Sequence, residues 1–356
     1  MNFAPSVDLY TNLDSTVIGP RSFGSDPDRA GVLGEAFAQG SLAAGVIPTA
    51  KHFPGHGDTS LDSHGRLPQI EIDLQTLQNR ELVPFKYLIR AQIPAVMSGH
   101  LSFPLIEKDG TPASLSKYFL TDILRNQLGY KGLVITDDMM MNGATLFAGS
   151  LHRAVTLAIE AGNDIIISST TASLDSMLWE QNLSRMATNS AFKNRVKESA
   201  YRVIFAKLNY FKSGNAAPLY PDESKIEESI PDKEGQRFFL DQACRSVSLY
   251  KANSSFPYKA QAAEKVLIAS PFLSFQKEGH RRYPQADTYY FAYDLASDQS
   301  NYDQWNATNL LSIAQGYDTV IINVFDRHSA NIARRLERTG CRIIVLSTMS
   351  PVFVLQ

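Results

Sequence analysis

The sequence contains little that points to a membrane, a nucleic acid or a disulfide framework. Its 356 residues include only two cysteines, Cys244 and Cys341, which are too few for a disulfide framework. No stretch approaches the roughly 18 apolar residues of a membrane-spanning helix. The net charge of −2 indicates no attraction to nucleic acid or an anionic membrane. A signal-peptide pattern is also absent, and both a cytoplasmic and an exported location stay open.

Size and composition are those of a soluble globular protein. Hydrophobic residues make up 44% of the chain and charged residues 20%, which are ordinary values. The length exceeds what one hydrophobic core usually supports, so we expect two domains.

One loop concentrates proton-carrying side chains. Lys51–Thr59 and Asp62–His64 together hold three histidines and two aspartates within thirteen residues. Pro54, Gly55 and Gly57 exclude a regular helix, and the apolar residues 47–50 before them resemble the end of a buried strand. A strand that leads into a polar loop is typical of the active-site end of a (β/α) barrel.

Three interpretations of this loop are open. It is a solvated turn, a metal site, or an acid/base site. His52 and His56 have i, i+4 spacing, but the proline and glycine between them exclude a helical zinc pair, so we predict no metal. Asp62 and His64 are close enough in sequence to share a hydrogen bond, and histidine both gives and takes a proton near neutral pH.

A second candidate site follows an apolar run. Leu133–Ile135 reads as a buried parallel strand, and Asp137 and Asp138 come at its carboxyl end, where barrel enzymes place their chemistry. Capping of the next helix would be enough to explain one of these two aspartates without any catalytic role. Because adjacent like charges are costly, we expect one carboxylate to act in catalysis and the other to be structural.

These residues carry a resemblance to family 3 glycoside hydrolases, specifically the β-N-acetylglucosaminidases of the NagZ type. The matching segments run in family order through about the first 170 residues: Asn2–Pro5, Val17–Gly24, Lys51–Thr59, Asp62–His64, Met97–His100, Pro112–Ser116 and Thr136–Asp138. The long histidine segment is the most specific of them.

The resemblance implies roles for particular residues. Asp137 is expected to be the nucleophile, His64 the acid/base and Asp62 its partner. Arg21, Lys51 and His52 are expected to hold the sugar hydroxyls. No cofactor is implied.

The first part of the chain alternates strands and helices, which predicts a parallel sheet. A helix capped by Asp26 with Pro27 at its first position should bury Leu33, Ala36 and Phe37, and Ser116 should cap a second helix that stops at Gly129. The expected strands are Asn2–Asp8, Ile47–Phe53, Ala95–His100, Leu133–Asp137 and Asp164–Ser168.

The expected fold class is α/β: a (β/α)8 TIM-barrel-type catalytic domain, N-terminally incomplete, followed by an α/β sandwich domain. We expect the barrel domain at 1–212, a linker at 213–235 and the second domain at 236–356, which is itself expected to be incomplete. Members of the family carry about three βα units before the first strand found here, in a barrel of ~250 residues. Their third strand supplies a carboxylate that grips the sugar, and Asp8 is no obvious substitute.

An open barrel has a physical consequence. Five βα units cannot close eight strands, so we expect these residues alone to be poorly soluble or oligomeric, with little hydrolysis. The predicted reaction is retaining hydrolysis of terminal β-linked N-acetylglucosamine from a peptidoglycan fragment, and the expected partner is this carbohydrate substrate. The alternatives are a family 3 β-glucosidase and a catalytically inactive sugar-binding remnant.

Overall fold

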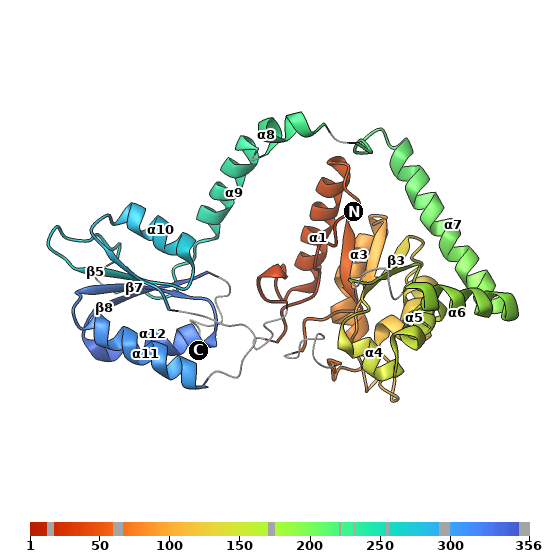
Figure 1. Ribbon diagram of the computed structural model, residues 1–356, viewed down its shortest axis with the longest axis horizontal. Helices are drawn as coiled ribbons and strands as arrows, with labels where there is room; N and C mark the ends of the chain where they lie inside the picture. The colour runs from red at the N-terminus through yellow and green to blue at the C-terminus, as the bar shows by residue number, and fades with distance from the viewer. Residues whose placement is uncertain are drawn as a thin grey trace. The chain divides into compact units, whose positions relative to one another are not determined.

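The computed structural model describes residues 1–12, 18–59, 67–169, 175–220, 222–230, 232–253, 256–291 and 300–348. Contacts divide the chain into two compact units, Met1–Pro221 and Asp222–Gln356, and each unit has its own parallel sheet (Figure 1). The division falls inside the segment 213–235 that the sequence marks as a linker. Within the described ranges, no helix has the length and apolar character needed to cross a bilayer.

The sheet of the first unit has four parallel strands in the order β1-β2-β3-β4. The strands are β1 (Thr49–Phe53), β2 (Ala95–Ser98), β3 (Leu133–Asp138) and β4 (Ile165–Ile167). All four lie inside or within one residue of the strands expected from the sequence. This confirms the predicted α/β class with a parallel sheet.

The strand expected over Asn2–Asp8 is corrected by the structure. This segment runs parallel to β1 but pairs only through two isolated bridges, from Asn2 to Pro48 and from Ser6 to Lys51. Pro5 lies between the two bridges and has no N–H to donate to a ladder. The segment therefore borders the sheet as an extended chain and ends at Asp8, level with the end of β1.

Helices follow the strands in the repeating pattern that the sequence predicts. Asp26 accepts a hydrogen bond from the Arg29 amide at the start of the first helix, and Ser116 Oγ accepts one from the Phe119 amide at 3.2 Å. The helical segments are η1 (Gly19–Arg21), α1 (Pro27–Ala43), α2 (Leu74–Thr76), η2 (Leu77–Glu81), α3 (Leu82–Arg90), η3 (Ala113–Leu115), η4 (Tyr118–Gln127), α4 (Asn142–Ala148), α5 (Leu151–Ala161), α6 (Asp175–Thr188) and α7 (Ser190–Lys212).

The buried face of α1 differs from the expected one. Leu33, Ala36 and Phe37 are exposed, and the buried positions are small residues that include Gly31 and Gly34. A Cβ on Gly31 would lie 2.4 Å from the Tyr87 ring, so α1 packs too closely on α3 for larger side chains. The prediction was wrong because the apolar pattern shows which residues are hydrophobic but not how near the next helix comes.

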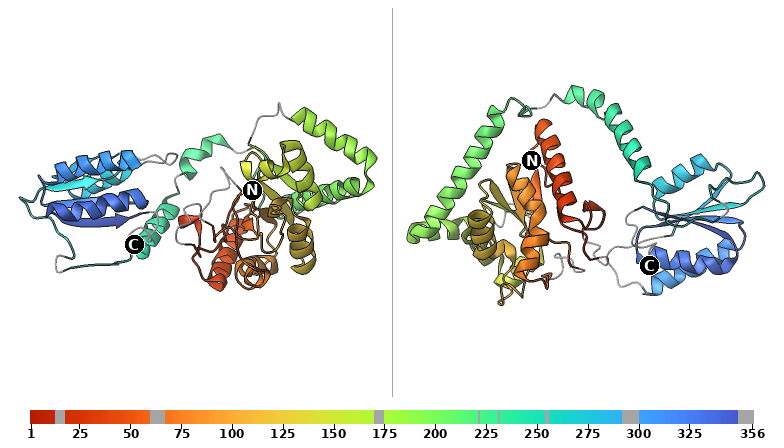
Figure 2. Two further views of the ribbon diagram at one scale, coloured as in Figure 1. Left: turned by 90° about the horizontal axis from the view of Figure 1, so that it is seen from below. Right: turned by 180° about the vertical axis from the view of Figure 1, so that it is seen from behind.

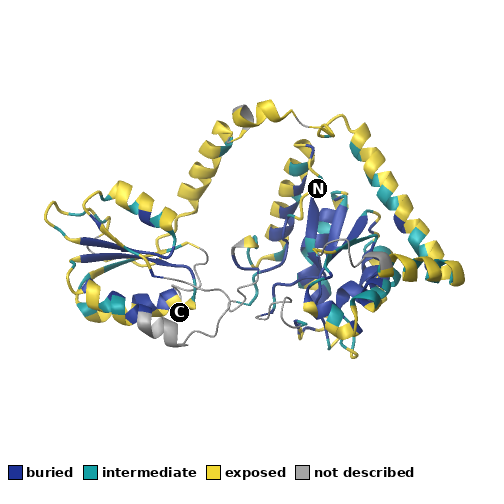
Figure 3. Cartoon of the chain, in the orientation of Figure 1, coloured by how far each residue is buried: buried dark blue, intermediate teal, exposed yellow. Residues whose placement is uncertain are grey.

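The strands of the first unit are covered on both faces (Figure 3). Val96 and Val134 face a core that includes Phe85 of α3 and Phe119 of η4. The alternate residues face a smaller cluster that α7 covers, made of Ala95, Leu133 and Ile135 with Ile165, Ile167, Val203 and Ala206. Near-continuous apolar strands are expected where both faces are buried.

A buried carboxylate ties α7 to the sheet. Asp164, whose side chain is 0% exposed, pairs with Arg125 at 2.6 Å, Arg195 at 2.7 Å and Arg202 at 3.1 Å. Burial alone would raise the pKa of Asp164, but Arg125 and the other donors outweigh it and hold that pKa below its usual value. The carboxylate therefore stays charged and neutralises a cluster of arginines.

We expect Asp164→Ala to destabilise the protein strongly. The replacement leaves partly buried guanidinium groups without their counter-charge, which typically costs about 3–5 kcal/mol. Urea unfolding measures the loss. Glu198→Ala is the matched control, because Glu198 pairs with Arg195 and Arg202 from a side chain that is 59% exposed, where ion pairs contribute under about 1 kcal/mol. Equal losses in the two variants would contradict this account of Asp164.

The second unit also has four parallel strands, in the order β6-β5-β7-β8. The strands are β5 (Val266–Ala269), β6 (Asp287–Tyr289), β7 (Thr319–Val324) and β8 (Arg342–Ser347). The helical segments are η6 (Glu223–Lys225), α8 (Ile226–Ser229), α9 (Lys233–Ser246), α10 (Leu273–Arg282), α11 (Ser300–Ala314), α12 (Arg327–Leu336) and η7 (Glu337–Thr339).

Helices cover both faces of this second sheet (Figure 2). Leu267 and Ala269 pack against α11 and α12, in one cluster with Leu310 and Ala333. Val266 and Ile268 instead share a cluster with Phe275 of α10. The unit is therefore a three-layer α/β arrangement with its core divided between the two sides.

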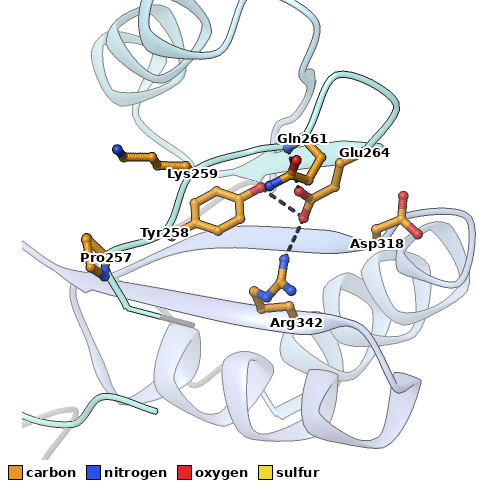
Figure 4. Close-up of a pocket in the computed structure, with 7 residues that line it drawn as sticks. All are labelled: Pro257, Tyr258, Lys259, Gln261, Glu264, Asp318 and Arg342. Atoms are coloured by element: carbon orange, nitrogen blue, oxygen red, sulfur yellow. Dashed lines mark hydrogen bonds and ion pairs between the residues drawn. The ribbon is translucent and has the colours of Figure 1, made fainter. Parts of the chain in front are cut away.

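A polar cluster lies at the amino ends of these strands (Figure 4). Glu264 accepts hydrogen bonds from Tyr258 Oη at 3.1 Å, Thr319 Oγ1 at 2.5 Å, Arg342 Nη1 at 2.7 Å and the Gln261 amide at 2.9 Å. Ligand sites of parallel sheets lie at the opposite, carboxyl ends. Because these groups satisfy one another, we interpret the cluster as a tie between residues 258–264 and the sheet.

Candidate active site

Polar side chains gather at the carboxyl ends of neighbouring parallel elements in the first unit. Asp8 ends the extended segment beside β1, Lys51 and His52 lie near the end of β1, His100 follows β2, and Asp137 lies near the end of β3. The carboxyl ends of parallel strands meet at one edge of a sheet, the edge where barrel enzymes carry their active sites. The arrangement is therefore that of an active site.

Asp137 lies near the end of β3, where the register of β3 against β4 shifts between Ile135 and Asp138. Its carboxylate is 19% exposed, and Oδ2 lies 3.8 Å from His52 Nε2. One carboxylate oxygen, Oδ1, accepts the Asp138 amide at 2.9 Å. The group is thus held in place by its own backbone while remaining reachable.

An irregularity in β1 brings two consecutive side chains to Asp137. The register of β1 against β2 shifts between Ala50 and Phe53, at Lys51 and His52. Regular alternation would send neighbouring side chains to opposite faces, and such irregularities are common beside active sites, where they re-aim a side chain. Lys51 interacts electrostatically with Asp137, and His52 lies beside the same carboxylate.

Lys51 links Asp137 to a second cation, Arg21. Partial burial and the charge of Arg21 lower the pKa of Lys51, while Asp137 and Asp8 act in the opposite direction. Arg21, at the end of η1, therefore belongs to the same charge cluster as Lys51. The structure brings together four of the residues chosen from the sequence: Arg21, Lys51, His52 and Asp137.

Asp138 is tied into the backbone around it. Its Oδ1 accepts the amides of Met140 and Ser169, each at 3.0 Å, which joins the turn after β3 to the end of β4. Burial acts to raise the pKa of Asp138, but the bonds from Ser169 and Met140 outweigh it and lower that pKa. These contacts support a structural role for this second carboxylate.

His100 is a site residue that sequence reasoning did not single out. It is 1% exposed, its Nδ1 lies 2.7 Å from Ser114 Oγ, and its Nε2 lies 3.1 Å from the Asp138 carbonyl. A carbonyl only accepts, so Nε2 carries the proton. Burial lowers the pKa of His100, and the neutral ring fixes the backbone next to Asp137. Its position directly after a buried strand was the available signal.

Asp8 was also missed. Its carboxylate is 1% exposed and lies 2.7 Å from His52 Nδ1. Burial acts to raise the pKa of Asp8, but its interactions with the adjacent His52 outweigh it and hold that pKa far below its usual value. The signal was its place at the end of the segment that runs along β1.

His56 lies in the same interior region. Its ring is 5.5 Å from that of His52, edge to face, and the residue is 2% exposed. Neither ring nitrogen has a hydrogen-bond partner among the residues that the structure describes. Burial, followed by the neighbouring His52, lowers the pKa of His56, so the ring is neutral near pH 7. Its amide, by contrast, is bound by Asp8 at 2.7 Å.

Two of the chosen residues, Asp62 and His64, lie outside the described residues. The structure therefore covers the nucleophile candidate and the sugar-holding candidates, and the acid/base pair rests on the sequence. Among the residues described, no group of three or more histidines, cysteines or carboxylates is placed to hold a metal ion.

Arg80 forms a brace of two ion pairs, with Glu81 and with Asp58, that supports the histidine loop. Glu81, at the end of η2, is 1% exposed, and its Oε1 accepts from Arg80 Nε at 2.6 Å. Arg80 also pairs with Asp58, so the brace reaches the loop itself. A Cβ on Gly55 would lie 2.9 Å from Glu81 Oε2. Gly55 also has a φ of 135°, so both its contacts and its backbone favour glycine there.

Glu81 should make folding stability depend on pH. Burial raises the pKa of Glu81 from 4.5 to about 7, although Arg80 opposes the shift. Between those pH values the folded state holds a proton that the unfolded state has lost. The stabilisation is therefore complete below about pH 4.5 and is lost as the pH rises through about 7, an effect of roughly 3 kcal/mol.

Glu81→Gln tests this linkage, because glutamine imitates the protonated side chain. Urea unfolding between pH 4.5 and 8 should show a flatter pH dependence in this variant than in the unmodified protein. Glu198→Gln, on the exposed side of α7, is the control and should keep the original slope. An unchanged slope in Glu81→Gln would show that Glu81 does not titrate in this range.

Comparisons with known proteins agree with this geometry. The family model described as "Glycosyl hydrolase family 3 N terminal domain" matches residues 1–206. A β-hexosaminidase of Hydrogenovibrio crunogenus is 42% identical over 166 residues, which are 47% of this chain and 45% of that protein. β-Hexosaminidase A of Pseudoalteromonas piscicida is 32% identical over 285 residues, 75% of this chain and 46% of its own length.

The chain spans about half the length of the curated relatives it matches. A solved structure covers it more fully. The glycoside hydrolase family 3 β-N-acetylglucosaminidase from Paenibacillus sp. str. FPU-7 superposes with a TM-score of 0.81 at 25% identity, over 100% of this chain and 68% of that one.

Proposed function

Since this chain belongs to glycosyl hydrolase family 3, we propose that it hydrolyses terminal β-linked N-acetylglucosamine with retention of configuration. The observation that carries the proposal is the placement of Asp137. It stands at the carboxyl end of β3, 3.8 Å from His52 and within the electrostatic range of Lys51. Asp138, the competing carboxylate, is engaged by the amides of Met140 and Ser169.

In the first step, Asp137 attacks the anomeric carbon and the bond to the leaving oxygen breaks. The product is a glycosyl ester on Asp137. His64 gives its proton to the departing oxygen, so the leaving group departs as an alcohol. Asp62 orients the imidazole and stabilises its charged form.

In the second step, water replaces the ester oxygen at the anomeric carbon. The neutral His64 formed in the first step takes a proton from the attacking water, and the Asp137 carboxylate is released. Two inversions give net retention. Here a histidine acts as the general acid and base, whereas most retaining glycosidases use a second carboxylate for this role.

Arg21, Lys51 and His52 are proposed to hold the sugar hydroxyls. The positions support this role, because Lys51 and His52 lie beside Asp137 and Arg21 lies near Lys51, and a bound sugar has to place its anomeric carbon beside that carboxylate.

The finer proposal for the substrate is a peptidoglycan fragment in which N-acetylglucosamine is linked to a muramic unit. It is supported by the histidine segment Lys51–Thr59 with Asp62–His64, which resembles the NagZ type. The curated relatives named β-hexosaminidase also come from bacteria, whose walls contain this linkage.

Hydrolysis of chromogenic sugars tests the proposed function. The protein should release the chromophore from the β-N-acetylglucosaminide much faster than from the β-glucoside. Preference for the glucoside would instead support the β-glucosidase alternative. Binding of N-acetylglucosamine without turnover of either substrate would support an inactive sugar-binding protein.

A further inference from the structure

The Asp8 carboxylate uses both of its oxygens as hydrogen-bond acceptors, for backbone amides and for side chains. Oδ1 accepts the backbone amides of His52 at 3.0 Å and His56 at 2.7 Å. Oδ2 accepts Ser6 Oγ–H at 2.8 Å and faces His52 Nδ1 at 2.7 Å. The two oxygens thus have different partners: one holds the backbone, and the other faces an imidazole.

The contact with Oδ2 decides where the His52 ring carries its proton. Asp8 is buried and ionised, and an ionised carboxylate only accepts hydrogen bonds. Nδ1 must therefore be the protonated nitrogen. In the neutral ring, Nε2 is then left with a lone pair. Its distance of 3.8 Å from Asp137 Oδ2 is too long for a hydrogen bond.

We infer that Asp8 is a positioning residue that holds His52 in the Nδ1–H form, so that Nε2 accepts a hydrogen bond from a hydroxyl of the sugar bound beside Asp137. The identity of the sugar rests on the proposed function, whereas the state of the ring does not. Nε2 then serves as an acceptor beside Asp137, near which Lys51 supplies a donor. A sugar hydroxyl both donates and accepts, so this combination suits it.

Asp8→Asn separates this role from loop anchoring. The asparagine side chain has to turn its oxygen toward the amides of His52 and His56, because its NH2 group would otherwise face two N–H donors. The NH2 group then occupies the position of Oδ2 and donates to His52 Nδ1. The backbone contacts survive, but the ring proton moves to Nε2, which changes from an acceptor into a donor.

Nitrogen NMR of the ligand-free protein reads the ring directly. With ¹⁵N-labelled histidine, His52 is assigned by the signals that disappear in His52→Gln. The unmodified protein should show a protonated Nδ1 and an unprotonated Nε2, and Asp8→Asn should show the reverse. A protonated Nε2 in the unmodified protein, or no change in Asp8→Asn, would overturn the inference. This readout requires no catalysis, so it remains informative even if the proposed function is wrong.

Kinetics supply the functional half of the test. On the β-N-acetylglucosaminide, Asp8→Asn should lower kcat/KM by on the order of 100-fold, because a protonated Nε2 can no longer accept the hydrogen bond that the sugar hydroxyl donates. Ser6→Ala is the matched variant: it removes the other hydrogen bond to Oδ2 but leaves the bond to His52, and we expect a loss of only a few-fold. Equal losses in both variants, with the His52 ring unchanged, would reduce Asp8 to a structural residue.

Discussion

Asp137→Asn is expected to remove nearly all turnover, with kcat lowered on the order of 10⁴-fold or more. The asparagine side chain is almost isosteric with the carboxylate. Its oxygen can still accept the hydrogen bond that the Asp138 backbone N–H donates to Asp137 Oδ1 at 2.9 Å. It is, however, too weak a nucleophile to form the glycosyl ester. Binding of N-acetylglucosamine should change much less than kcat. Steady-state kinetics of the protein with its natural ends measure both quantities.

Asp138→Asn is the matched control for this prediction. Its amide oxygen can still accept from Met140 and Ser169, the two amides that Asp138 now binds at 3.0 Å, so the turn after β3 should persist. We expect a clearly smaller loss of kcat than in Asp137→Asn. If the two variants ranked in the opposite order, the assignment of the nucleophile would have to move to Asp138.

His64→Ala is expected to have the second-largest effect, and the effect should depend on the leaving group. A sugar or alkoxide leaving group needs a proton as it departs, so turnover of such substrates should fall by roughly 10²–10⁴-fold. An activated aryl glycoside leaves without that proton and should be affected far less. Kinetics on a series of aryl glycosides with graded leaving-group pKa values give the comparison.

Asp62→Asn should show a milder defect with a shifted pH profile, because it changes the charge beside the imidazole without removing the imidazole. A uniform loss across all leaving groups in His64→Ala would indicate that His64 is structural and that another group supplies the proton.

The parts of the fold that the sequence predicted best are those fixed by local pattern. The strands β2 and β3 are apolar runs bounded by polar or turn residues, and their ends were predicted to within about two residues. The cap formed by Asp26 before Pro27 was likewise predicted, because a capping side chain binds an amide in the first turn of the helix that directly follows it.

What the sequence did not predict depends on contacts between distant segments. Asp8 meets His52, which is 44 residues away, and no local pattern shows that a carboxylate will receive an imidazole. The buried face of α1 is a similar case, because it depends on how closely Gly31 of α1 approaches the Tyr87 ring of α3. The placement of Lys51 and His52 beside Asp137, with Arg21 near Lys51, was expected only through the family resemblance, and the structure adds the irregularity in β1.

The central claim, that Asp137 carries the sugar through a covalent intermediate, is tested most directly by trapping that intermediate. A fluorinated N-acetylglucosamine analogue with a good leaving group forms the glycosyl ester quickly and loses it slowly. Peptide mass analysis of the treated protein should find one added sugar on the peptide that contains residues 132–141, with fragmentation placing it on Asp137. A sugar on Asp138, or inactivation without any covalent sugar, would contradict the account.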